Sequence, residues 1–134
     1  MPGSLCRYLT SALLLSISCS LNAHHSDSMY DLESLISIRG ILTGVKWSNP
    51  HVELQVEGTN ESGERIDYVI EISWPSSLLR NGLSRDSFAI GEFVEIEGNP
   101  SKEPGRIAAW GRTVVKEDGT ILRLPSKANF IPGE

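Results

Sequence analysis

Cysteine is scarce in this 134-residue chain, which contains only Cys6 and Cys19, both near the N-terminus. The rest of the sequence therefore offers neither a disulfide nor a thiolate metal site, so its stability must come from a buried core. Charge is equally scarce at the start, because Arg7 is the only charged side chain before Asp27. The apolar run over residues 9–21 is shorter than the roughly 20 residues that span a bilayer. These absences argue against a disulfide scaffold and against a membrane-spanning segment.

Residues 1–23 have the three parts of a cleavable export signal. Arg7 supplies the basic start, the apolar run follows, and Leu21-Asn22-Ala23 places the small Ala23 directly before the expected cut. Removing these 23 of the 134 residues would leave a periplasmic or secreted chain of 111, with no transmembrane segment. The alternative is lipoprotein processing at Ser16-Ile17-Ser18-Cys19, which would anchor the protein through an acylated Cys19.

The negative net charge of the chain bears on which classes of partner it is expected to bind. The formal charge is −5, and loss of Arg7 with the signal would make it −6. An acidic domain is repelled by phosphate backbones, so we expect no nucleic-acid partner. An envelope protein or a small ligand is the kind of partner that remains.

The hydrophobic pattern predicts one all-β domain over residues 35–124, between a polar N-terminal arm (24–34) and a C-terminal tail (125–134). The first strand is expected over 35–47, where the alternation slips by one residue at Gly40, as in a β-bulge. Further alternating segments predict strands around residues 52–56, 66–72, 94–96, 107–115 and 121–124.

One short helix is expected after the third strand. Ser76 or Ser77 would cap it and Gly82 would close it, and residues 98–100 would stop the fourth strand. A bent first strand and a helix between strands three and four are typical of a Greek-key barrel of the OB type. The sequence therefore predicts a small OB-like barrel of five to six strands, with an open β-sandwich as the alternative.

The three histidines are the most informative local feature of the sequence. His24 and His25 follow the expected cleavage site, and His51 lies at the turn between the first two strands. If Val52 faces the core, His51 takes the opposite phase and is expected on the outer face, where it could meet the N-terminal arm.

Cleavage before His24 would place a free α-amine beside an imidazole. These two nitrogens can chelate one metal ion, and a third imidazole would complete a T-shaped site that suits Cu(II). A second mode uses the α-amine together with the amide and imidazole of His25. The candidate metal ligands are therefore His24, His25 and His51, with copper as the expected metal; the bland alternative is that the first two belong to an unstructured polar arm.

No nucleophile–base arrangement, phosphate-binding loop or dinucleotide motif is present in the sequence, and we predict no catalytic residue. Trp47, Asn49 and Trp110 are further candidate contacts for a ligand. We interpret the outward-facing carboxylates as a solvated acidic face rather than a catalytic pair; they are Glu53, Glu57, Asp67, Glu71, Glu95 and Glu97.

Several motifs together resemble a family of small secreted bacterial proteins, the domain of unknown function 6152. The motifs are Ala23-His24-His25-Ser26, the segment from Gly44 to His51, the segment from Leu78 to Phe88, and the segment from Gly91 to Gly98. The family usually has aspartate where this chain has Glu92. The resemblance implies export and a single domain, and it implies no activity.

The sequence thus favours an exported binding domain, with copper as its candidate ligand, over an enzyme. One alternative is a metal-independent module that docks a protein or glycan of the cell envelope. A small hydrolase or a copper redox enzyme is a weaker alternative.

Overall fold

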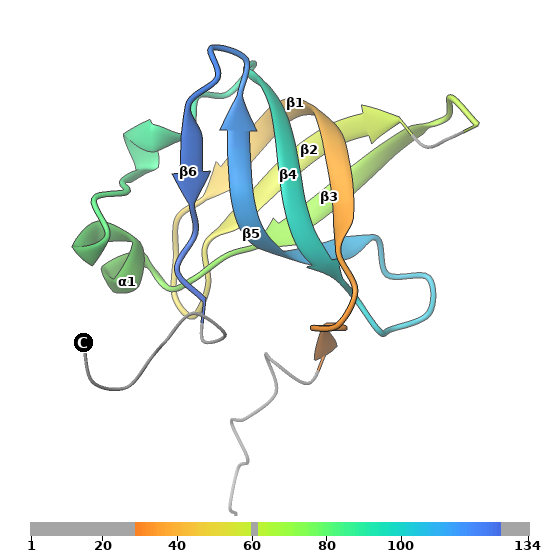
Figure 1. Ribbon diagram of the computed structural model, residues 1–134, viewed down its shortest axis with the longest axis horizontal. Helices are drawn as coiled ribbons and strands as arrows, with labels where there is room; N and C mark the ends of the chain where they lie inside the picture. Colours follow the sequence, from red (N-terminus) through yellow and green to blue (C-terminus); the bar gives the residue numbers. More distant parts are fainter. Residues whose placement is uncertain (1–28, 60–61, 127–134) are drawn as a thin grey trace, which may run out of the picture.

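The alternating segments form strands in the computed structural model, which describes residues 29–59 and 62–126 (Figure 1). The elements in chain order are β1 (Ile36–Lys46), β2 (Glu53–Thr59), β3 (Arg65–Glu71), α1 (Pro75–Arg80), η2 (Arg85–Ser87), β4 (Phe93–Pro100), β5 (Ala108–Lys116) and β6 (Ile121–Arg123).

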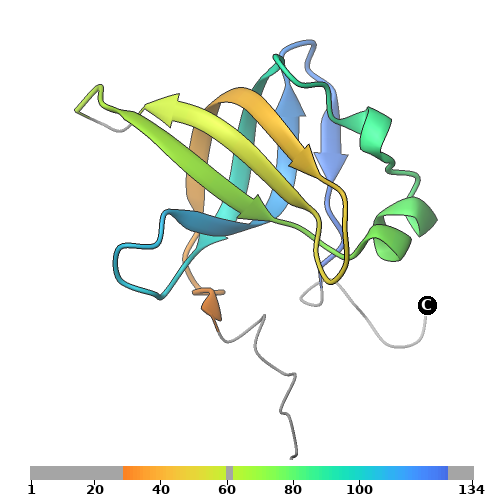
Figure 2. The ribbon, with the colours of Figure 1, turned by 180° about the vertical axis from the view of Figure 1, so that it is seen from behind.

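The strands form one sheet in the order β3-β2-β1-β4-β5-β6, and a further pairing joins β3 to β5. That pairing is parallel and matches Ile70 with Ala109 and Glu71 with Trp110, so strands β1 to β5 close into a barrel. The helix α1 lies on the same side of the barrel as β6, which extends the sheet beyond β5 (Figures 1 and 2). The predicted OB-like Greek-key barrel is confirmed, and closure rules out the open sandwich.

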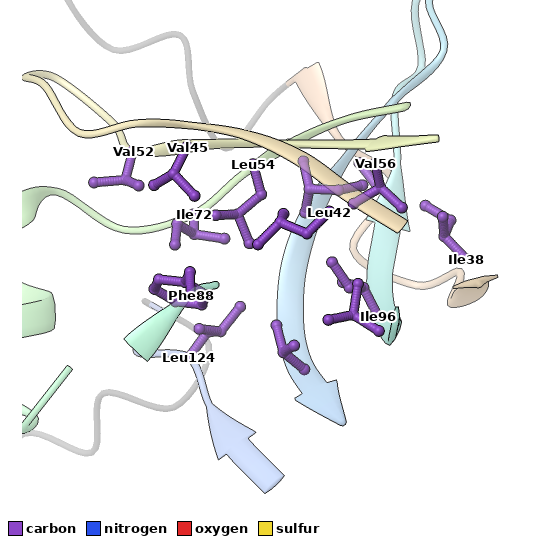
Figure 3. Packing of buried hydrophobic residues seen from close by; sticks show 14 of the residues in the cluster. Ile38, Leu42, Val45, Val52, Leu54, Val56, Ile72, Phe88, Ile96 and Leu124 are labelled. Carbon is purple, nitrogen blue, oxygen red and sulfur yellow. The ribbon is translucent and has the colours of Figure 1, made fainter. Parts of the chain in front are cut away.

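The inward-facing residues of all five barrel strands fill the interior (Figure 3). Because side chains alternate along a strand, every second residue of β2 is buried, as the sequence predicts. The most deeply buried apolar side chains of the barrel strands are Leu42, Leu54, Val56, Ile70, Val94, Ile96 and Val114.

The predicted bulge of the first strand lies at another position. The sequence placed the slip at Gly40, but Ile38, Gly40 and Leu42 all face inward, and the register with β2 shifts between Leu42 and Gly44. Gly40 occupies a buried, inward-facing position where β2 passes very close. A Cβ there would overlap the backbone of Glu57, so this position requires glycine. Ile41, which a slip at Gly40 would have turned toward the core, is 39% exposed.

Two predicted element boundaries are also wrong. Neither Ser76 nor Ser77 caps α1, because Pro75 occupies the first helical turn and moves the N-cap to Trp74. Residues 98–100 do not stop β4 but form its end, since Asn99 and Pro100 pair with Trp110 and Ala109 across a second register shift. Gly82 does follow the helix C-cap, with a φ of 77° that suits glycine.

Candidate functional site

The β1–β2 loop and the β4–β5 loop lie at the same end of the barrel, beside the start of the described chain (Figures 1 and 2). Backbone hydrogen bonds tie the first loop to the end of β3: Val52 N–H donates to the Ser73 carbonyl, and Ile72 N–H to that of Val52. The Asn49–Pro50 peptide in this loop is cis. His51 is thereby held next to Glu71, the last residue of β3.

His51 is half-buried rather than fully exposed on the outer face, with 18% of its side chain accessible. Its Nδ1 lies 3.4 Å from Oε2 of Glu71. Its ring meets the ring of Trp110 edge to face, with centroids 5.1 Å apart and planes at 87°. Two neighbours therefore flank the imidazole, a carboxylate near one nitrogen and an indole against the ring.

Glu71 also receives the cation of the β4–β5 loop. Nη2 of Arg106 donates to Oε1 of Glu71 at 2.5 Å, and only 29% and 17% of the two side chains are exposed. Nη1 of the same guanidinium lies 3.6 Å from Glu103. The Glu71 carboxylate thus links the two loops, because one of its oxygens contacts Arg106 and the other lies near His51.

Tyr30 anchors the N-terminal arm to the same place. It is 1% exposed and forms a β-bridge with Ser101, while Lys102 N–H donates to the Met29 carbonyl at 2.8 Å. Its ring lies 5.9 Å from that of Trp110, and the guanidinium of Arg106 stands 6.0 Å above it. The arm therefore begins its described course packed against the residues that hold His51.

The hydroxyl of Tyr30 is the unusual atom of this cluster. It is buried and makes no hydrogen bond of good geometry with any described residue. Burial raises the pKa of Tyr30 well above its usual range, and the nearby Glu71 carboxylate raises it further. The phenol is therefore neutral and leaves a buried polar group at the docking point of the arm.

The structure brings together two of the residues predicted from the sequence, His51 and Trp110. His24 and His25 lie outside the described residues. Trp47 packs partly buried against the core, and Asn49 is exposed in the same loop. Within residues 29–59 and 62–126 no group of three histidine, cysteine, aspartate or glutamate side chains could hold a metal ion.

Sequence reasoning missed Tyr30, Glu71 and Arg106. Glu71 was interpreted as one carboxylate of a solvated face, yet it is half-buried between two loops. Other members of that face are paired with bases: Arg39 with Glu95, Lys46 with Glu53, and Arg65 with Glu57. Only the position of Glu71 at the end of its strand, beside the histidine turn, could have singled it out.

A model of a family of unknown function, DUF6152, matches residues 12–109 of the chain. The chain belongs to this family. In this DUF6152 domain the match includes Tyr30, His51, Glu71 and Arg106, and it ends one residue before Trp110. No curated protein and no solved structure matches the chain significantly. Among the described residues, no helix is long and apolar enough to cross a membrane.

Proposed function

We propose that this chain is an exported binding domain that holds Cu(II) between His51 and the two histidines of its mature N-terminus. The observation that carries the proposal is the docking of Tyr30 against Trp110, the residue on which the His51 ring also rests. A functional role at this end of the barrel agrees with the OB architecture, in which the corresponding loops bind ligands.

The covalent reach of the arm is sufficient for this arrangement. His25 precedes Tyr30 by five residues, which can span up to roughly 17 Å when extended. The separations from Tyr30 to Trp110 and from Trp110 to His51 are 5.9 and 5.1 Å between ring centroids. Both are well below this reach, so the anchored arm can bring either histidine to His51 without disturbing the bridge at Ser101.

The environment of His51 favours metal ligation through one nitrogen. His51 Nδ1 lies 3.4 Å from the Glu71 carboxylate, and a neutral imidazole that carries its proton on Nδ1 keeps its lone pair on Nε2. A carboxylate that orients a histidine in this way is a common feature of metal sites, where it fixes the tautomer and raises ligand basicity. Arg106 in turn holds the carboxylate in place.

The remaining ligands become available when the export signal is cleaved. Cutting after Ala23 makes the α-amine and imidazole of His24 available, and His51 adds a third nitrogen. A planar set of nitrogen ligands suits Cu(II). If His25 supplies the imidazole instead, its own amide nitrogen becomes a ligand.

The test is calorimetric titration of Cu(II) into protein that was expressed with residues 1–23, recovered after export and checked by mass spectrometry to begin at His24. We expect His51→Ala, and separately acetylation of the α-amine of His24, each to weaken binding at least about tenfold, since each removes one ligand. Ser48→Ala, in the same loop, is the matched control and should bind as the parent does.

Two further variants separate the two modes. His24→Ala abolishes the chelate built on the first residue, whereas His25→Ala abolishes the one that uses the second residue and its amide. Unchanged affinity in both His51→Ala and the acetylated protein contradicts the proposed geometry. A chain that starts at an acylated Cys19 has no free α-amine at His24, so it could not form this site.

A further inference from the structure

The outer face of β4, β5 and β6 carries a group of charged side chains that is separate from the His51 site. An open cavity of about 190 Å³ lies on the outer face where β4, β5 and β6 run side by side. It is lined by Leu35, Glu97, Arg112, Thr113 and Arg123. At about 30 Å³ for each water it has room for about six, which limits a ligand to the size of a small metabolite.

The strand register places three of these side chains in a row. Glu97 on β4 pairs with Thr113 on β5, which in turn pairs with Arg123 on β6. Glu97 and Arg123 are therefore two strand spacings apart, roughly 10 Å between backbones. Neither forms an ion pair with any residue in the part of the chain that the structure describes.

Arg112 is brought to the same face by an irregularity of the ladder. Thr113 pairs with Glu97 and Gly111 with Gly98, which leaves Arg112 as the additional residue between them. Such an insertion redirects a side chain. The fully buried Asn99 then accepts a hydrogen bond from Nη1 of Arg112 at 3.1 Å, while its own amide donates to the Ser34 carbonyl at 2.7 Å. Arg112 is thus held in place by the protein interior.

The cavity is lined by both negative and positive side chains, and this determines which ligands it can bind. A simple anion at the two guanidinium groups would be repelled by Glu97, and a simple cation at Glu97 would be repelled by the arginines. A molecule that carries an ammonium and a carboxylate a few bonds apart satisfies both sides. Leu35, 63% exposed, offers an apolar wall for a short side chain, and the Thr113 hydroxyl offers one further hydrogen bond.

We propose that this cavity binds a free α-amino acid with a short apolar side chain, its carboxylate at Arg123 and its ammonium at Glu97. The proposal is independent of copper, because the cavity shares no residue with the His51 cluster.

The experiment is an NMR titration of the ¹⁵N-labelled full chain with L-valine and with the two molecules that lack one of its charged groups. Isobutylamine lacks the carboxylate, and 3-methylbutanoate lacks the ammonium. We expect valine to give saturable amide shifts on β4, β5 and β6, and each partial analogue to bind about two- to fivefold more weakly, since it loses one ion pair at an exposed surface.

Variants then assign the contacts. Glu97→Gln and Arg123→Gln lie at exposed positions and should fold normally; each should weaken valine binding about two- to fivefold. Arg85→Gln, an exposed arginine on η2, should leave it unchanged. The proposal is overturned if valine gives no saturable shifts, if 3-methylbutanoate binds as tightly as valine, or if Glu97→Gln has no effect.

Discussion

The interior of the barrel and the corner at which the N-terminal arm docks are built from different kinds of side chain. The interior is apolar, and Leu54, Ile70 and Ile96 have no exposed surface at all. The corner consists of the polar side chains around Trp110, which are those of His51, Glu71, Arg106 and Tyr30. Apolar burial is non-directional and stabilises the fold in proportion to area, whereas the polar contacts depend on geometry and contribute little net stability. The interior therefore supplies most of the stability, whereas the corner depends on the geometry of its polar contacts.

The largest effect expected from this comparison is the loss of a core side chain. Ile70→Ala should lower the free energy of unfolding by roughly 2–5 kcal/mol, because Ile70 is fully buried between β2 and β5 and leaves a cavity. Urea denaturation measures this. Leu35→Ala, at a side chain 63% exposed, is the control and should change stability by no more than about 0.5 kcal/mol. Equal effects at the two positions would contradict the assignment of stability to the interior.

A smaller effect is expected at the carboxylate that links the two loops. Glu71→Gln should cost about 1–2 kcal/mol in the same assay, since it removes the charge-assisted bond to the half-buried Arg106. The matched control is Glu57→Gln, which breaks the exposed pair with Arg65 and should cost less than Glu71→Gln. A larger loss at Glu57 than at Glu71 would mean that the corner is no better ordered than the open surface.

The smallest effect concerns the hydroxyl of Tyr30. Tyr30→Phe should leave stability unchanged near neutral pH or raise it by up to about 1 kcal/mol, because a buried hydroxyl without a hydrogen bond is removed while the ring stays. A loss of more than about 1 kcal/mol would show that the hydroxyl has a partner.

The same variant should also alter the response to alkali. Burial raises the pKa of Tyr30 in the folded state above that of an unfolded tyrosine, near 10. The unfolded chain therefore releases this proton first, so the stabilisation from this group is complete below about pH 10 and is lost as pH rises above it. Between about pH 10 and 11, unfolding free energies should fall more steeply for the parent protein than for Tyr30→Phe. Parallel curves would contradict the raised pKa.

The sequence predicts the interior well because burial in a strand has a period of two. The alternation from Val52 to Val56 and from Ile66 to Ile72 identified the inward faces directly. The alternation failed at Gly40, since a glycine carries no side chain whose polarity could show which way the residue faces. The residue type at this position is set by the close approach of the Glu57 backbone on the neighbouring strand.

The corner was less predictable because it depends on contacts between distant segments. His51 and Trp110 could be singled out as candidates, but their contact follows from the parallel pairing of β3 with β5. That pairing also gives Glu71 its neighbours, so its role could not be distinguished from that of Glu57 by spacing alone. Tyr30 lies in a segment whose composition indicated only a polar arm.

The parallel pairing of β3 with β5 also has a consequence for the order of folding. Hairpins such as β1–β2, β2–β3 and β5–β6 join segments close in sequence, whereas Glu71 meets Trp110 across residues 72–109, which contain α1, η2 and β4. Closing a longer loop costs more chain entropy, so this seam is expected to form late. The surroundings of His51 would then be completed only in chains that have already finished folding, and a ligand bound there would select such chains from partly folded ones.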